Sequence, residues 1–98
     1  MTRDEIIARL RELEPQLRAR GITRLQMFGS RARGDERPDS DLDLLVDVRP
    51  DANFSLLDLS GMHRQLTEVL GIESYPTTSR SIDERFRREI APELVLVF

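Results

Sequence analysis

Apolar residues recur every three or four positions over the first twenty residues, which is typical of an amphipathic helix. They are Ile6, Leu10, Leu13 and Leu17. Thr2 and Glu5 have the spacing of a capping box and predict the start of this helix. Pro15 predicts a kink or a break into two short helices, and Gly21 predicts the end of the helical region.

The pattern then changes to that of extended strands. Residues 22–28 predict a short strand that runs into Gly29, and residues 42–48 predict a second strand. The second strand is almost continuously apolar, which favours a central position covered on both faces. Between the two, residues 29–40 predict a loop with one helical turn that begins at Ser30.

The second half of the chain returns to helix and strand in turn. Ser55 as N-cap and Gly71 as stop predict a long helix. Residues 72–75 predict a third strand, which Pro76 ends or confines to a sheet edge. A second capping-box pattern at residues 81–84 predicts a short helix to about Ile90, and residues 94–98 predict a last strand. The order α-β-β-α-β-α-β predicts an α+β fold with helices packed on a small mixed sheet.

Composition limits what such a fold can do. A chain of 98 residues predicts one domain, residues 1–98, and 39% hydrophobic with 34% charged residues is typical of a soluble globular protein. No apolar run approaches the roughly 18 residues of a membrane span, and the charged start predicts no signal peptide, so we expect a cytoplasmic protein. The chain has no cysteine and a single histidine, which excludes thiol chemistry and any site that needs two histidines.

The candidate functional residues lie around the segment between the two predicted central strands. They are Gly29-Ser30 and Asp41-Leu42-Asp43, which are separated by ten residues. A glycine followed by a serine lets backbone N–H groups and a hydroxyl approach a phosphate closely. Two aspartates one residue apart on a strand point to the same face, roughly 6–7 Å apart along the backbone, and supply the hard oxygen ligands that Mg²⁺ prefers. Each half alone is typical of turns and strand ends, but together they predict a metal–nucleotide site.

Arginines beside this segment add a local positive charge to a chain whose net charge is −3. The net charge argues against general nucleic-acid binding. Arg31, Arg33 and Arg37 nevertheless cluster next to the predicted site. Arg31 or Arg33 would neutralise the leaving pyrophosphate, while Ser30 and neighbouring N–H groups hold the terminal phosphates.

These residues resemble a known family, the minimal nucleotidyltransferases. The resemblance rests on the Gly-Ser and Asp-x-Asp spacing, on the Arg-Ala-Arg-Gly run at residues 31–34, and on Ser40 before the first aspartate. Members of this family are small prokaryotic relatives of DNA polymerase beta that commonly act as antitoxins. The resemblance implies the polymerase-beta-like nucleotidyltransferase fold over most of the chain.

The resemblance also implies an activity. Asp41 and Asp43 would be the catalytic residues and bind Mg²⁺, and Gly29 and Ser30 would hold the phosphates of ATP. The family transfers a nucleoside monophosphate to a hydroxyl, and members paired with a HEPN-type ribonuclease toxin add AMP to a toxin tyrosine. The implied partners are therefore ATP and a HEPN-type toxin in a hetero-oligomer, with no membrane and no direct nucleic-acid binding.

One departure from the family pattern leaves two hypotheses open. The family usually carries a third acidic residue on the strand after the long helix, and here Tyr75 stands near that position. Glu73 shares the face of Tyr75 and is a candidate third carboxylate, although it is also typical of a solvated strand-edge charge. The chain is thus either an active adenylyltransferase antitoxin or a catalytically weakened module that neutralises its partner by contact.

The apolar tail, residues 94–98, has two interpretations as well. It predicts a last strand packed on the core, or an edge that pairs with a partner chain.

Overall fold

A four-stranded mixed sheet forms the centre of the computed structural model, which describes all residues, 1–98. Its strands are β1 (Ile22–Phe28), β2 (Leu42–Val48), β3 (Ser74–Thr78) and β4 (Val95–Leu96), in the order β3-β2-β1-β4. β1 runs antiparallel to both β2 and β4, whereas β2 and β3 are parallel. The predicted α+β class and the mixed sheet are confirmed.

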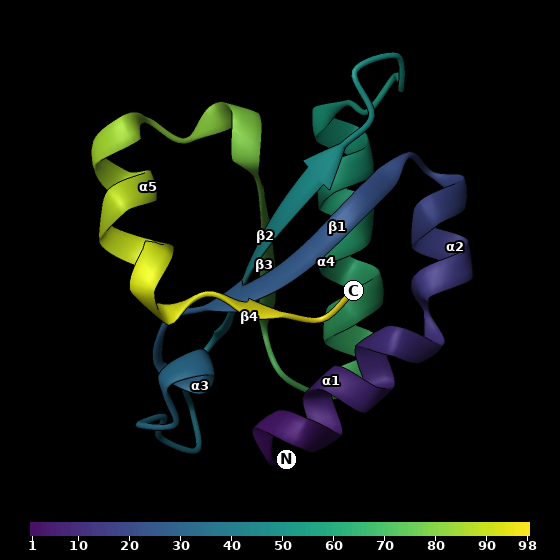
Figure 1. Ribbon diagram of the computed structural model, residues 1–98. Helices are drawn as coiled ribbons and strands as arrows, with labels where there is room; N and C mark the ends of the chain where they lie inside the picture. The colour runs from purple at the N-terminus through teal and green to yellow at the C-terminus, as the bar shows by residue number, and fades with distance from the viewer.

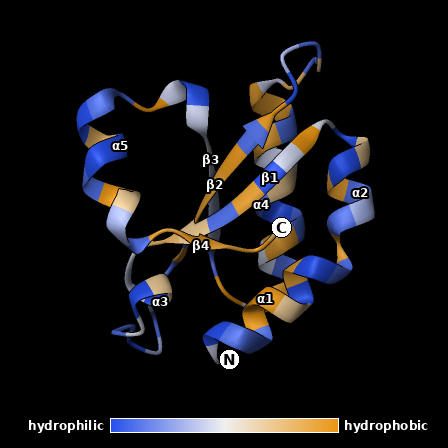
Figure 2. Cartoon of the chain, in the orientation of Figure 1, coloured by the Kyte–Doolittle hydropathy of each residue, from blue (hydrophilic) through white to orange (hydrophobic).

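The main core lies between one face of the sheet and the helices α1 (Arg3–Glu12), α2 (Glu14–Ala19) and α4 (Leu56–Leu70). In Figure 1 these helices lie to the right of and behind β1 and β2. Apolar positions of β1, β2 and α4 gather toward this interior (Figure 2). Leu10 of α1, one of the residues at helical spacing, is fully buried here, and so are Met62 and Leu66 of α4.

A smaller layer covers the other face of the sheet at the end where β1 stops. Here α5 (Glu84–Ile90) lies to the left in Figure 1 and packs Ile90 against Phe28 and Leu45. Phe86 of α5 meets Phe28 edge to face, with ring centroids 5.8 Å apart. Short 3-10 segments, η1 (Ser79–Ser81) and η2 (Ala91–Glu93), connect α5 to β3 and β4. No helix is long and apolar enough to cross a membrane.

Most of the predicted helix ends are confirmed. Thr2 and Glu5 form the capping box, with Thr2 Oγ1 accepting the Glu5 N–H at 3.2 Å and Glu5 Oε1 accepting the Thr2 N–H at 3.0 Å. The break near Pro15 falls at Leu13, so that Pro15 stands in the first turn of α2, where its missing N–H costs nothing. The predicted turn at Ser30 is the helix α3 (Ser30–Arg33).

Two boundaries differ from the predictions. α5 is capped by Asp83, whose Oδ1 accepts the Phe86 N–H at 2.8 Å, because Ser81 Oγ instead donates to the Thr78 carbonyl. The third strand is Ser74–Thr78, not 72–75, so Pro76 stands in its middle.

Pro76 fits inside β3 because this strand forms one edge of the sheet. Ser74 faces the open edge, where its N–H donates to Thr67 Oγ1 and its carbonyl bonds His63 Nδ1. Pro76, two residues further on, faces the same edge, and it has no N–H to leave unpaired. The α4 side chains and the proline thus protect this edge from pairing with another chain.

The apolar tail packs as the last strand, as one of the two interpretations predicted. Only Val95 and Leu96 pair with β1, but the Leu25 N–H also donates to the Phe98 carbonyl, and the Val97 N–H to the Leu25 carbonyl. Val97 is fully buried in the main core. The tail therefore forms the edge strand of the sheet that lies next to β1.

Candidate nucleotide and metal site

The sheet places the glycine turn directly beside the aspartate pair. Phe28, the last residue of β1, is the antiparallel partner of Asp43 in β2, so the chain turns at Gly29 next to the Asp43 carboxylate. Gly29 has φ +81°, and a Cβ built on it would overlap the Asp43 carboxylate. Glycine is required here both for the backbone conformation and for the space.

Asp41 and Asp43 form a carboxylate pair that has no salt-bridge partner in the protein. Neither side chain takes part in a hydrogen bond between side chains or in a salt bridge, and Asp43 is half-buried. Burial raises the pKa of Asp43, and the neighbouring charges of Asp41 and Glu93 raise it further, while Arg33 acts in the opposite direction. A divalent cation would relieve this repulsion.

The donor set fits magnesium with its substrate. Asp41 and Asp43 supply hard oxygen ligands, and no group of three or more His, Asp or Glu side chains converges closely enough to hold a metal. Magnesium usually completes its octahedral shell with water and substrate phosphates rather than with protein alone. The two aspartates are therefore suited to Mg²⁺ that arrives with a triphosphate.

Glu93 reaches the glycine turn from the far end of the chain, which the sequence analysis missed. Its Oε1 accepts the Gly29 N–H at 2.9 Å, and its Oε2 accepts from Arg33 Nη1 at 2.8 Å. The Arg33 guanidinium, together with the Gly29 N–H, holds the pKa of Glu93 below its ordinary value. No spacing or periodicity marks this glutamate, because its role depends on a contact across 64 residues.

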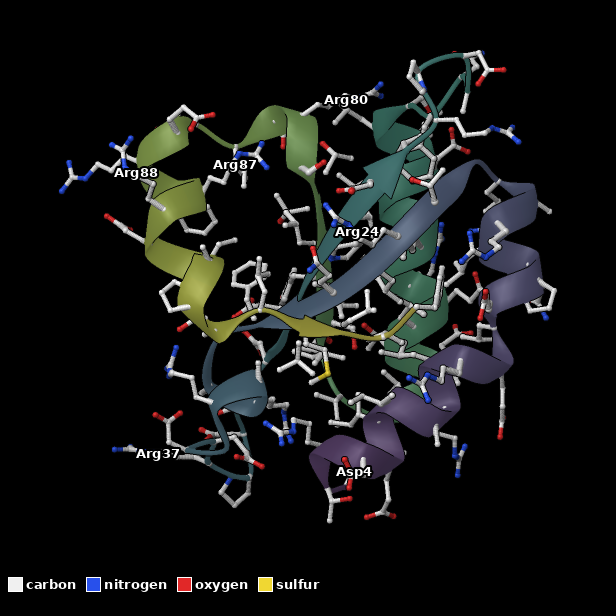
Figure 3. All side chains as sticks on the ribbon, viewed as in Figure 1. Asp4, Arg24, Arg37, Arg80, Arg87 and Arg88 are labelled. Carbon is white, nitrogen blue, oxygen red and sulfur yellow. The ribbon has the colours of Figure 1, made fainter.

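The arginines that follow Ser30 have different surroundings. Arg31 is only 5% exposed, and its Nε donates to the Ser40 carbonyl at 2.9 Å, so it holds the turn that leads into Asp41. Arg33 is exposed and pairs with Glu93 and Asp35. Arg37 points outward from the loop between α3 and β2 (Figure 3). Arg33 is thus the arginine that can reach a phosphate by exchanging partners.

Tyr75 of β3 and Glu73, which directly precedes this strand, lie beside the aspartate pair. Tyr75 is the parallel cross-strand partner of Asp43, and the Leu42 N–H donates to the Glu73 carbonyl at 2.8 Å. The Glu73 carboxylate lies 3.5 Å from Nε2 of His63. A cavity of about 210 Å³ lies here, with Asp41 and Glu73 both in its lining. Glu73 is near the site, but it does not form a metal-holding group with the two aspartates.

A carboxylate pair at the start of a central strand, beside a glycine-serine turn that opens a helix, is the arrangement that the sequence motif predicted. The chain matches the model of the nucleotidyltransferase domain over residues 4–92 and belongs to that family. Within it the chain is a minimal nucleotidyltransferase, as the sequence motif predicted.

Two proteins named as adenylyltransferases are similar in sequence over most of this chain. A candidate protein adenylyltransferase of Methanocaldococcus jannaschii is 38% identical over 87% of this chain and 89% of its own. The protein adenylyltransferase MntA of Thermococcus cleftensis is 31% identical over 99% of this chain and 97% of its own.

Solved structures share the fold. A candidate minimal nucleotidyltransferase matches with TM-score 0.81 and 32% identity, over 97% of this chain and 95% of that one. A chain from the complex of a tri-AMPylated HEPN toxin of Shewanella oneidensis with MNT antitoxin matches with TM-score 0.72, over 99% of this chain and 72% of that one. At 13% identity the second match shows a common fold.

Proposed function

We propose that this nucleotidyltransferase is the antitoxin of a toxin–antitoxin pair and transfers AMP from ATP to a tyrosine hydroxyl of a HEPN-type toxin, in the cytoplasm and with Mg²⁺. Two relatives of similar length are named as protein adenylyltransferases, which supports protein as the acceptor. The HEPN toxin complex whose chain has this fold supports the kind of partner. The toxin and the antitoxin would form a hetero-oligomer.

The observation that carries this proposal is the carboxylate pair, without a salt-bridge partner, beside the glycine turn. Burial and the charge of Asp41 raise the pKa of Asp43. Such a shift is typical of a functional site, where a bound cation would offset the unfavourable negative charge. The overlap between a Cβ at Gly29 and Asp43 supports the proposal, because the turn that would bind the phosphates lies directly against a carboxylate that would bind the metal.

Each residue of the site has a role in this reaction. Asp41 and Asp43 would hold Mg²⁺, which supplies neutralisation of the triphosphate charge when bound. The turn at Gly29-Ser30 would position the phosphates through backbone N–H groups and the serine hydroxyl. Arg33 would leave Glu93 and pair with the pyrophosphate as it departs, and Arg31 would keep the turn before Asp41 in place.

The chemical step is displacement at the α-phosphorus of ATP. The acceptor hydroxyl oxygen forms a bond to this phosphorus, the bond to the bridging oxygen of pyrophosphate breaks, and the hydroxyl proton passes to a nearby base. Positioning and charge neutralisation account for most of the catalysis in reactions of this type.

Incubation of the protein with its HEPN-type partner, Mg²⁺ and α-labelled ATP tests the proposal. We expect label on a partner tyrosine that is lost with EDTA and with the double variant Asp41→Asn/Asp43→Asn. A partner that remains unlabelled under all conditions would contradict the proposal.

A second candidate function is neutralisation by contact alone, which the position of Tyr75 favours. Tyr75 stands directly opposite Asp43, where a third carboxylate would be near enough to accept the acceptor proton. If contact alone neutralises the toxin, the double variant Asp41→Ala/Asp43→Ala will protect against the toxin as well as wild type does, and no label will be transferred.

A further inference from the structure

The two carboxylate oxygens of Glu93 bind two donors of the proposed phosphate site at the same time. Oε1 accepts the Gly29 N–H at 2.9 Å, and Oε2 accepts from Arg33 Nη1 at 2.8 Å. One donor is a backbone amide and the other is a guanidinium, and both kinds of group commonly bind phosphate oxygens. A phosphate group also presents two oxygens on one side. The Glu93 carboxylate thus stands on the donors that a phosphate would use.

Glu93 reaches these donors from a separate part of the chain. It lies in η2, between α5 and β4, and this segment passes next to α3 (Figure 1). Its side chain is 20% exposed, and Ala91 and Pro92 beside it are exposed as well. The carboxylate can therefore turn into solvent by rotation about its own side-chain bonds while η2 stays in place. Release of the two donors requires no rearrangement of the sheet.

The donors cannot serve Glu93 and a nucleotide together. The Gly29 amide has a single N–H to donate, and Glu93 accepts it. Burial raises the pKa of Asp43, and the charges of Asp41 and Glu93 raise it further, so the three carboxylates act on one another. A triphosphate that took Arg33 from Glu93 would leave this carboxylate facing like charges alone. Binding of the nucleotide therefore requires that Glu93 leave.

We propose that Glu93 is a specificity-determining residue that competes with the β- and γ-phosphates of a nucleoside triphosphate for Gly29 and Arg33. The proposal rests on the function proposed above and adds a residue that lies outside both sequence motifs. Glu93 holds the two donors while the site is empty, leaves them when the triphosphate binds, and returns to them as pyrophosphate departs. It lowers the affinity for the nucleotide and promotes release of the product.

This competition distinguishes nucleotides by their number of phosphates. The β- and γ-phosphates carry several negative charges and enough oxygens to replace both bonds of Glu93. AMP has only the α-phosphate, the group that is transferred, and it leaves both donors to Glu93. ATP and pyrophosphate should therefore respond to a change at Glu93, whereas AMP should not.

Calorimetric titration of the full chain with pyrophosphate, ATP and AMP, each with Mg²⁺, tests the proposal. Glu93→Gln keeps an oxygen that can accept the Gly29 N–H but removes the negative charge. Because hydrogen bonds of charged groups are about twice as strong as neutral ones, we expect pyrophosphate and ATP to bind roughly 10-fold more tightly, and AMP as to wild type. Pyrophosphate should also inhibit label transfer by this variant at correspondingly lower concentrations.

Asp35→Asn is the matched control. Asp35 also pairs with Arg33, at 3.2 Å, but it is 62% exposed, and the Gly29 N–H bonds Glu93 instead. We expect its loss of charge to change the affinity for pyrophosphate by less than about 2-fold. Glu93→Asp is a second variant, which keeps the charge on a side chain too short to reach both donors. It should also bind pyrophosphate more tightly than wild type does.

The outcomes separate this competition from the proposed function. Pyrophosphate affinity that is unchanged or weaker in both Glu93 variants overturns the competition, and label transfer to the partner would then leave the proposed function intact. Equal gains for Asp35→Asn and Glu93→Gln also overturn it, because any charge removed near Arg33 would then have the same effect. An equal gain for AMP overturns it as well. A wild type that binds neither ATP nor pyrophosphate and transfers no label overturns both proposals.

Discussion

Glu93 and Gly29 are joined by a hydrogen bond across 64 residues, in which Oε1 of Glu93 accepts the Gly29 N–H at 2.9 Å. The other carboxylate oxygen accepts from Arg33, so one side chain from η2 holds both ends of the first turn of α3. The C-terminal segment thereby supports the conformation of the turn that faces Asp43. A loop that carries substrate would otherwise be expected to be among the less stable parts of the fold.

Removing this support should loosen the glycine turn. Glu93→Ala is expected to lower the free energy of unfolding by about 1 kcal/mol, because it leaves the partly solvent-exposed Gly29 N–H without its acceptor and Arg33 with Asp35 alone. Glu89→Ala on α5 is the matched control, since its exposed pair with Arg85 should contribute less than about 0.5 kcal/mol. Thermal and urea denaturation measure both.

The effect of Glu93→Ala should also depend on pH. The Arg33 guanidinium lowers the pKa of Glu93 in the folded state, so the stabilisation is present above the ordinary glutamate value of 4.5 and is lost as the pH falls through the lowered value. The difference between wild type and Glu93→Ala should therefore shrink in acid. A difference that stays constant down to the acid transition would contradict this role.

Gly29 and Gly34 provide a matched pair of substitutions. Both have positive φ, +81° and +84°, but a Cβ on Gly29 meets the Asp43 carboxylate and a Cβ on Gly34 meets nothing within 4 Å. Gly34 has ψ 16° and is left-handed, so Gly34→Ala should cost about 1 kcal/mol. Gly29 has ψ −165°, a conformation almost restricted to glycine, so Gly29→Ala should cost about 1–3 kcal/mol. Only Gly29→Ala should displace the Asp43 carboxylate and abolish Mg²⁺-dependent nucleotide binding, measured by calorimetry. Equal binding by the two variants would show that the close approach at Gly29 has no role.

How far the sequence predicted this protein depends on how local each feature is. The capping box at Thr2, the N-cap at Ser55 and the Gly-Ser and Asp-x-Asp spacing are encoded within a few residues. The structure has both caps and brings the two motifs together. The predicted bounds of the third strand, residues 72–75, are wrong because Pro76 does not end it, but the alternative that Pro76 confines this strand to a sheet edge is confirmed. Glu93 was missed because its contact joins segments that only the folded sheet brings together.

Asp43 should cost the unliganded protein stability. Its pKa is raised by burial and by Asp41, so its ionised form is unfavourable in the folded state. The protein then loses stability as the pH rises through the raised pKa and regains it as the pH falls. We expect Asp43→Asn to raise the melting temperature by a few degrees at neutral pH, with a gap that closes in acid. Addition of Mg²⁺ and ATP should stabilise wild type and leave Asp43→Asn unchanged.

Arg31 and Arg33 should differ in what their removal affects. Arg31 is buried and donates to the Ser40 and Pro38 carbonyls, so Arg31→Ala should cost about 2 kcal/mol because those acceptors lose their donor. Arg33 is exposed, and Arg33→Ala should cost less than about 1 kcal/mol. If Arg33 pairs with the departing pyrophosphate, its removal should lower kcat severalfold with the fold unchanged. A larger loss of stability for Arg33→Ala than for Arg31→Ala would reverse these roles.

Changes in β4 test whether this edge strand has only a structural role or also binds a partner. Removal of residues 95–98 takes away Val97, whose burial alone is worth about 1.5–3 kcal/mol, together with the bonds between β4 and β1. We expect that truncation to unfold much of the protein and to reveal nothing about partners. Leu96 is 54% exposed, so Leu96→Glu should change stability by no more than about 0.5 kcal/mol. If β4 has only a structural role, this variant will neutralise the toxin as well as wild type does. Loss of toxin binding in a fully folded Leu96→Glu variant would instead identify β4 as the edge that meets the partner.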